Sequence, residues 1–558
     1  MRKDVSKEKR GSVSSRASRE AREEADAAAE ARVAARAPLP EPEWARTAIA
    51  ALLVVSSLLL GVRLYAAWVV GFGDSEALYA CWAAHPQPAY LDHPGLIGIV
   101  ARAIGEGAIP TPLRSHVLTS NIATLVPWAA YFTARAAGAD RGRAAIAGLV
   151  LAVVPETAVG LFALTPDLLL APAWLGTIAL AAVALRAPAG STRSATAFLG
   201  AGLLAGTACA AKVSGGLLVA TLIASYLWIT FARDGSAVDG GARDNSGERA
   251  AIRTIWPWAG VAAGLVVVYP IVVYEAKTGW PMLRHRFVDT QTGAGVALKN
   301  IGALLGGQLL YVSPIFVLLA FLAARDLYRE RKRDEVSRLL FLAFAVPFVP
   351  LLFLCLWSPV AEPHWIAPAL LVLPIHVARR ARGITTRRMF IAASSVAALL
   401  TVLVYGWVLV PESAKLLPAS ADPKVDITSE LYGWPRAFES AKEQMGGAAT
   451  PFDPEGREVV VVGPHWTVCA QLQAGMPGVR VGCATDIKDD FDGWMPREEW
   501  RKAEHVLFVT DNRFPGNGAE QLPEHVRSSQ ARVRVMRGGR TSRIFELYLY
   551  ERRAHGSL

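Results

Sequence analysis

The stretch TAIAALLVVSSLLLGVRLYAAWVV, residues 47–70, decides the fold class of this chain. It contains a single charged side chain, Arg63. A run of about 18 or more apolar residues can cross a bilayer as a helix, and a helix satisfies its own backbone hydrogen bonds in lipid. We therefore predict a membrane-spanning helix here.

Apolar runs of the same kind recur along most of the chain, and 53% of its 558 residues are hydrophobic. A soluble protein of this length rarely carries so much apolar sequence. Together with the first run, they predict a polytopic α-helical membrane protein with about eleven spans. The further runs are 117–136, 144–163, 168–186, 196–211, 215–232, 257–275, 302–322, 338–357, 364–379 and 389–411.

The charges between the runs predict the orientation. Residues 1–43 are rich in Ala, Arg, Glu and Ser and lack an apolar stripe, which predicts a disordered cytoplasmic tail. Counting outward from this tail, every loop expected in the cytoplasm is basic, as the positive-inside rule requires. The net charge of +10 therefore reflects topology, and we expect no nucleic-acid partner. An odd number of spans in the cell (inner) membrane places the C-terminus in the periplasm or outside the cell.

Residues 412–558 differ in kind from the predicted transmembrane domain at 44–411. Polar segments with helical character, 429–445 and 465–474, alternate with short β-branched runs. This alternation predicts a small extracytoplasmic α/β domain. Cys469 and Cys483 fall in this domain, where an oxidising compartment permits a disulfide. The β-branched runs are 457–463, 479–484, 505–511, 531–536 and 543–550.

The predicted topology gathers ionisable residues from distant parts of the chain at the outer ends of the spans. Such groups are costly at membrane depth and usually serve function. Each also has an ordinary explanation: Asp74 and Glu76 as interfacial acids, Asp167 as a helix cap, and Lys212 as a snorkelling cation. The histidines are not at metal-ligand spacing. The gathered ionisable residues are Asp74, Glu76, His85, Asp92, His93, Asp167, Lys212, Glu275, Lys277, Arg284, His285, Arg286, Glu362 and His364, and the aromatic Trp365 follows His364 directly.

Six motifs in this part of the chain resemble, in residue sequence and in order, those of GT-C glycosyltransferases of the family 39/83 type. This is the superfamily of protein O-mannosyltransferases and the lipid A aminoarabinose transferase, and the resemblance covers roughly residues 50–440. Three positions depart from the family pattern: Ser75 splits the usual Asp-Glu pair, Gly95 replaces a Pro and His364 replaces an Asn. The motifs are DSEALY at 74–79, YLDHPGL at 90–96, TPD at 165–167, AKVS at 211–214, GQLLYVSP at 307–314 and HWIAP at 364–368.

The resemblance implies transfer of a sugar from a polyprenyl-phosphate donor to a lipid, glycan or protein acceptor on the outer face of the membrane. A first-loop carboxylate, Asp74 or Glu76, would deprotonate the acceptor hydroxyl. Lys212 would stabilise the departing phosphate, a role that a divalent metal ion can also fill. The metal requirement and the metal ligands stay open. The other expected substrate-binding residues are Tyr79, Asp92, His93, Asp167, His364 and Trp365.

Two rival functions remain at this level. A solute transporter or polyprenyl-lipid flippase would also be polytopic, but transporters tend to place ionisable groups mid-span and to contain internal repeats. Here the charges cluster at one face, and we find no repeat in the sequence. An inactive family member that only binds polyprenyl lipid is the second rival, because Ser75 interrupts the acidic pair.

Overall fold

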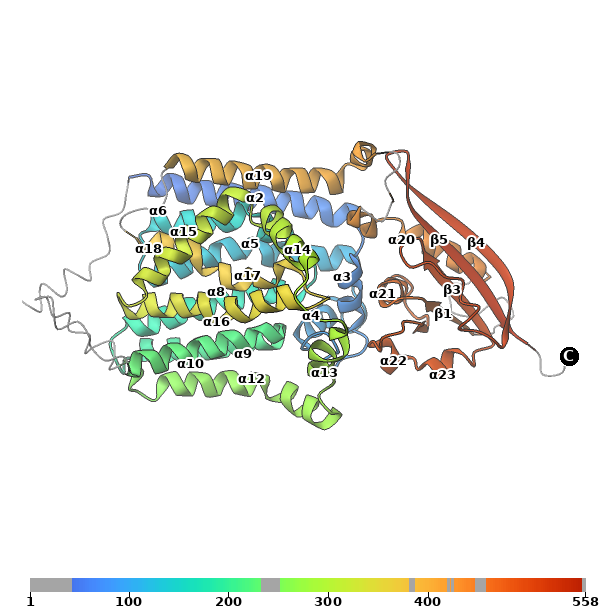
Figure 1. The fold of residues 1–558 in the computed structure, drawn as a ribbon, viewed down its shortest axis with the longest axis horizontal. Coiled ribbons are helices and arrows are strands. Elements are labelled where there is room, and N and C mark those ends of the chain that lie inside the picture. The colour runs from blue at the N-terminus through green and yellow to red at the C-terminus, as the bar shows by residue number, and fades with distance from the viewer. Residues whose placement is uncertain are drawn as a thin grey trace, which may run out of the picture.

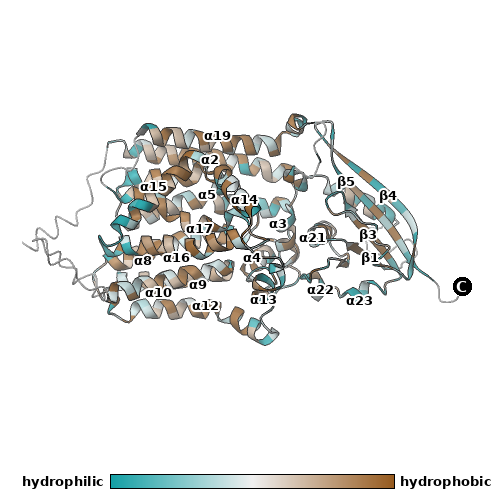
Figure 2. Ribbon diagram, viewed as in Figure 1, coloured by the Kyte–Doolittle hydropathy of each residue, from teal (hydrophilic) through white to brown (hydrophobic). Residues whose placement is uncertain are grey.

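The protein consists of a helical bundle with a sheet domain at one end of it (Figure 1). The computed structural model describes residues 43–231, 251–380, 387–418, 422, 426–446 and 458–553. The predicted tail therefore lies outside the described residues, apart from Glu43. Hydrophobic residues dominate the long helices, and polar residues gather at the helix ends far from the sheet domain (Figure 2).

Seven helices among the described residues are long and apolar enough to cross a membrane, and the count rises to nine if each of two bent pairs is one span. The pairs are α6 (Arg141–Val153) with the segment Pro155–Phe162, and α14 (Leu298–Tyr311) with α15 (Pro314–Glu330). The polytopic membrane fold predicted from the sequence is thus confirmed. The seven are α2 (Ala45–Val69), α8 (Pro166–Arg186), α9 (Thr192–Ala211), α10 (Gly216–Phe231) together with the 3₁₀ turn η2 (Val213–Gly215) before it, α12 (Trp256–Thr278), α16 (Glu335–Trp357) and α19 (Arg387–Leu409).

Two of the eleven predicted runs do not meet this criterion. The run at 117–136 lies in α5 (Pro112–Ala137), which is long but carries many polar side chains. The run at 364–379 is broken into short helices, α17 (Ala367–Leu370) and α18 (Val372–Arg379). Summed hydropathy does not detect the break within 364–379, whereas α5 is unbroken and misses the criterion because of its polar side chains.

The sheet domain contains a five-stranded mixed sheet in the order β2-β1-β3-β5-β4. The strands β1, β2 and β3 are parallel, whereas β5 runs antiparallel to β3 and to β4. Helices α20 (Trp434–Gln444) and α21 (Trp466–Gly475) occupy the two segments predicted to be helical. The strands are β1 (Val459–Gly463), β2 (Val481–Cys483), β3 (His505–Asp511), β4 (His525–Arg537) and β5 (Arg540–Arg552), each overlapping one predicted run.

One hydrophobic core joins the sheet domain to the first polar loop of the bundle. Buried residues of α3 (Asp74–Cys81) and α4 (Leu96–Ile104) share this core with strand residues such as Val461 and Phe545. Helix α21 packs on α3, and a disulfide between Cys469 and Cys483 ties α21 to β2. The sheet domain therefore holds the loop that carries the first family motif.

Candidate functional site

The first loop folds back on itself between α3 and α4. The ring of Trp82 stacks on Tyr90 with centroids 3.9 Å apart. The backbone N–H of Tyr90 donates to the carbonyl of His93 at 2.9 Å. Gly95 is required here, because a Cβ at this position would lie 2.2 Å from the carbonyl oxygen of Gln87. The loop thereby presents Asp92 and His93 at the tip of a closed turn.

Asp74 lies under the sheet domain and is almost fully buried. Its Oδ2 is 2.6 Å from Nη1 of Arg513, and its Oδ1 accepts a hydrogen bond from Nε2 of Gln471 at 3.3 Å. Glu430 lies 3.6 Å from the same guanidinium group. Burial and the charge of Asp74 raise the pKa of Glu430 to about 7. Asp74 therefore belongs to a buried charge network between the bundle and the sheet domain.

Glu76 caps the helix in which it lies. It accepts hydrogen bonds from the backbone N–H groups of Gly73 at 2.9 Å and of Leu164 at 2.6 Å, and its Oε1 lies 3.1 Å from Nε2 of His116. Burial alone would raise the pKa of Glu76, but His116 and these hydrogen bonds outweigh it and hold the pKa below its usual value. Both oxygens are engaged by protein groups, as in a capping box.

Lys212 and Asp167 form a partly buried ion pair where α9 ends and α8 begins. The Nζ atom of Lys212 lies 2.7 and 2.9 Å from the two carboxylate oxygens of Asp167. Thr165 is the N-cap of α8, so Asp167 pairs with the lysine rather than capping the helix. Lys212 is 7% exposed and therefore does not snorkel to the surface. The ordinary explanations for both residues do not apply in this geometry.

His364 extends this pair from the short 3₁₀ turn η4 (Pro363–Ile366). Its Nε2 is 3.7 Å from Asp167, and its Nδ1 is 3.1 Å from Glu362. Burial lowers the pKa of His364, but the bond with Glu362 and the charge of Asp167 outweigh it, so the net shift is upward. The protonated imidazole of His364 is thus stabilised relative to a free histidine, next to the same Asp167 that holds Lys212.

Arg286 links the first loop to the same region. Its Nη1 is 3.4 Å from Asp92, and its guanidinium carbon lies 5.2 Å from the ring centroid of Trp365. The ring of Tyr79 is 5.9 Å from that of His93. Burial, together with the positive charges of Arg286 and Lys212, holds the pKa of His93 well below its usual value. His93 is therefore neutral in a cationic environment.

These contacts unite residues from five separate segments into one cluster, which we call the acid–base cluster. It contains seven of the nine predicted site residues and excludes Asp74 and Glu76, whose recorded partners lie elsewhere. Helices α3 and α13 (Pro281–Phe287), which carry Tyr79, His285 and Arg286, lie at the end of the bundle nearest the sheet domain (Figure 1). Its members are Tyr79, Asp92, His93, Asp167, Lys212, His285, Arg286, Glu362, His364 and Trp365.

The motif at 307–314 supports the cluster without joining it. Gln308 donates a hydrogen bond from Nε2 to the carbonyl of Pro363 at 2.8 Å. Gly307 packs directly on the same proline, since a Cβ there would lie 2.3 Å from the Pro363 side chain. These two contacts fix the turn that carries His364 and Trp365.

An apolar cavity of about 750 Å³ approaches the acid–base cluster from within the bundle. Asp167 and Glu156 line one end of it, and Arg143 and Arg380 line the other. Between these ends the walls are mainly apolar side chains of α2, α6, α8, α15, α18 and α19. The cavity follows α6, whose 13 residues span roughly 20 Å at about 1.5 Å per residue. Its apolar walls suit a hydrocarbon chain, with charged side chains near both ends.

Five relevant residues escape the list of site residues predicted from sequence: Glu156, His285, Arg286, Glu362 and Asp490. His285, Arg286 and Glu362 lie in predicted outer loops, but no family motif marks them. Glu156 lines the cavity near Asp167. It is the single ionisable residue in the predicted run 144–163, which could have identified it. Asp490, which contacts the first loop from the sheet domain, has no signal of this kind in the sequence.

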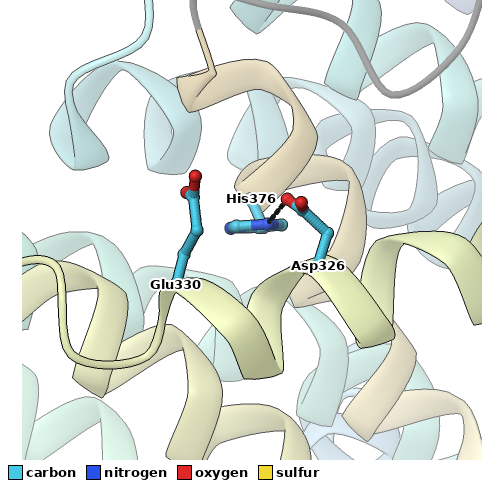
Figure 3. A group of neighbouring side chains, drawn as sticks. All are labelled: Asp326, Glu330 and His376. Atoms are coloured by element: carbon cyan, nitrogen blue, oxygen red, sulfur yellow. Dashed lines mark hydrogen bonds and ion pairs between the residues drawn. The ribbon is translucent and has the colours of Figure 1, made fainter.

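One group of potential metal ligands converges among the described residues, and it lies at the opposite end of the bundle. Asp326 and Glu330 of α15 face His376 of α18, with the ligand atoms within 4.8 Å of one another (Figure 3). The guanidinium group of Arg380 pairs with Asp326 and lies 2.9 Å from Glu330. This arginine already supplies the positive charge between the carboxylates, so we interpret the group as an ion-pair network.

The helical bundle with the sheet domain over its first loop resembles the GT-C fold of known membrane glycosyltransferases. Residues 112–237 match the family model described as dolichyl-phosphate-mannose-protein mannosyltransferase. No curated protein sequence matches the chain significantly. The GT-C resemblance inferred from the motifs is thus confirmed in the matched segment and at the level of the fold.

Two similar solved structures are those of ArnT from Cupriavidus metallidurans. The structure bound to undecaprenyl phosphate has a TM-score of 0.56 and 16% sequence identity, and the match covers 90% of this chain and 98% of that chain. The apo structure has a TM-score of 0.54 at 16% identity, covering 90% and 97%. Both bundle and sheet domain are therefore included in the structural similarity.

Proposed function

We propose that this protein is a membrane glycosyltransferase that moves a sugar from a polyprenyl-phosphate donor to a lipid, glycan or protein acceptor. The observation that carries the proposal is the apolar cavity that ends beside Asp167, the partner of Lys212. A polyprenyl chain is apolar and its phosphate is anionic, so this combination fits both parts of the donor. The GT-C fold and the undecaprenyl phosphate bound by ArnT support the same donor class.

Lys212 and Arg286 are the cations suited to the donor phosphate. As the bond between the sugar C1 and the phosphate oxygen breaks, negative charge grows on the departing polyprenyl phosphate, and fixed positive charges stabilise it. His364 adds a further charge when it is protonated. Asp167 holds Lys212 in place through their ion pair, and the ring of Trp365 packs against the Arg286 guanidinium.

Asp92 is the first-loop carboxylate that lies in the acid–base cluster, and we assign it the role of general base. The acceptor hydroxyl would lose its proton to Asp92 while its oxygen attacks C1 of the sugar. The geometry favours Asp92 over Asp74 and Glu76, because the oxygens of those two are engaged by Arg513, Gln471, His116 and backbone N–H groups. A divalent metal ion is a further candidate for stabilising the departing phosphate, and it stays part of the proposal.

The predicted topology places the cluster and the sheet domain on the extracytoplasmic face of the cell (inner) membrane. The disulfide between Cys469 and Cys483 supports this placement, because disulfides persist in oxidising compartments. The sheet domain then acts as an accessory module over the site.

The test is a transfer assay with purified protein in lipid nanodiscs and a panel of radiolabelled polyprenyl-phosphate sugars. At least one donor should release polyprenyl phosphate in the presence of acceptor-containing membrane extract. Asp92→Asn should lower turnover by about 10²–10⁴-fold, and Lys212→Met should weaken donor binding. Lys277→Met is the matched control, since Lys277 is exposed at the same end of the bundle.

Two outcomes would contradict the proposal. Binding of polyprenyl-phosphate sugars without bond cleavage under any condition would indicate the inactive lipid-binding alternative. Movement of the intact donor between leaflets without release of polyprenyl phosphate would indicate a flippase.

A further inference from the structure

Asp490 of the sheet domain reaches into the first loop of the bundle. It precedes the short helix α22 (Phe491–Trp494). Its Oδ2 accepts a hydrogen bond from Nε1 of Trp82 at 3.0 Å, and its Oδ1 accepts one from the backbone N–H of Leu91 at 3.1 Å. The two donors are nine residues apart in the sequence, so one carboxylate fixes both sides of the loop.

These two hydrogen bonds act on the turn that presents Asp92. Trp82 stacks on Tyr90, and Leu91 directly precedes Asp92. The turn is closed by the hydrogen bond from Tyr90 to His93 and by the bridge between Ala89 and Pro94. With both Trp82 and the Leu91 N–H held, the Asp92 carboxylate is directed toward Arg286 at 3.4 Å.

The other contacts of the sheet domain with the first loop act at a different place. Gln471 donates to the carbonyl of Phe72 at 2.8 Å and Arg513 pairs with Asp74, both at the start of α3. Trp494 stacks on His85 with centroids 4.1 Å apart. These contacts explain how the domain docks. Among the polar contacts between the described parts of the bundle and the sheet domain, the hydrogen bond from Leu91 to Asp490 involves the residue next to Asp92.

We propose that Asp490 is a positioning residue for sugar transfer, through which the sheet domain sets the direction of the Asp92 carboxylate. The proposal rests on the proposed function and on the assignment of Asp92 as the base. Its physical reason is geometric: a proton is transferred only when the base lies within hydrogen-bond reach of the acceptor hydroxyl. A displacement of about 1 Å in such a group can cost about 10²-fold in rate.

The first arm of the test is kinetic. Asp490→Ala should lower kcat by about 10²-fold and leave the donor dissociation constant within about threefold, because Lys212 and Arg286 are untouched. In an Asp92→Asn background, measured under single turnover with excess protein, Asp490→Ala should cause no further loss. Asp486→Ala is the matched control, since Asp486 is an exposed acid of the same segment.

The second arm does not depend on activity. Hydrogen–deuterium exchange should show faster exchange of the Leu91 amide in Asp490→Ala and unchanged protection of β1 and β3. Trp82→Phe keeps an aromatic ring opposite Tyr90 but removes the Nε1 donor, so it should lower kcat less than Asp490→Ala does.

Three results would overturn the proposal: an unchanged kcat in Asp490→Ala, losses from Asp490→Ala and Asp92→Asn that multiply as independent effects, or unchanged exchange at Leu91. If the wild-type protein transferred no sugar from any donor, the proposed function would fail instead. The exchange arm would then still decide whether Asp490 holds the turn.

Discussion

Asp74→Asn separates the two roles that a first-loop acid can have. The change keeps the size of the side chain and removes its charge. In the structure the Asp74 carboxylate contacts Arg513 at 2.6 Å and Gln471 at 3.3 Å, and both partners belong to the sheet domain. We therefore expect the substitution to weaken docking of the sheet domain and to spare the chemical step.

The expected loss of docking free energy follows from the burial of Asp74 and Arg513. Breaking a fully buried ion pair costs about 3–5 kcal/mol. The Arg513 side chain is 25% exposed and keeps Glu430 at 3.6 Å, so solvent and a second acid compensate part of the loss. A charged hydrogen bond in this setting contributes about 1.5–3 kcal/mol, which is the docking penalty we expect. Turnover should fall less than about tenfold, whereas removal of a general base costs about 10²–10⁴-fold.

Docking can be measured by hydrogen exchange across α21 and by limited proteolysis, and turnover by the transfer assay. Arg513→Met should reproduce the docking defect, and the double variant Asp74→Asn with Arg513→Met should add little to either single change. Ser75→Ala is the control, because Ser75 is exposed beside Asp74. Abolished transfer in Asp74→Asn, with normal exchange in α21 and an active Arg513→Met, would refute this reasoning and identify Asp74 as the base.

Three further predictions concern the donor. Lys212→Met should weaken binding of polyprenyl phosphate by about 10–150-fold, the equivalent of one charged hydrogen bond, as measured by microscale thermophoresis; equal affinity in Lys212→Met and Lys277→Met would contradict it. Ala147→Trp should reduce donor binding by filling the cavity that Ala147 lines. The midpoint of thermal unfolding checks that the larger side chain is tolerated. Full donor affinity in a folded variant would exclude the cavity as the lipid site. Donor affinity should fall as pH rises through the pKa of His364, which is raised above the usual value of about 6.5, because the imidazolium charge is then lost. His364→Gln should flatten this part of the pH profile. An unchanged profile in His364→Gln would argue against a charged His364 at the phosphate.

The sequence predicts the secondary structure of both regions well, because the signals for it are local. Every predicted apolar run overlaps a helix, since hydropathy over a window is a sum of neighbouring residues. The β-branched runs of the sheet domain give the five strands for the same reason. The count of spans is less well determined by a window sum, because the run at 364–379 is broken into short helices and α5 carries many polar side chains. The orientation of the termini stays a prediction from loop charges.

The motifs in the sequence also identify the fold and most of the acid–base cluster. The stretches TPD, AKVS and HWIAP bring Asp167, Lys212 and His364 into the candidate site, and the structure places these three side chains together. The motifs do not reveal which way each side chain points. Asp74 and Asp92 belong to the same loop, yet one faces Arg513 and the other faces Arg286.

The sequence by itself determines the class of molecule, a polytopic membrane protein with a C-terminal α/β domain, because hydropathy and residue periodicity are properties of short segments. Only the tertiary structure decides which acid accompanies the cations. That choice depends on contacts between residues hundreds of positions apart, such as Leu91 with Asp490 and Asp74 with Arg513. Such contacts form when the sheet domain and the first loop bury their apolar surfaces in one shared core.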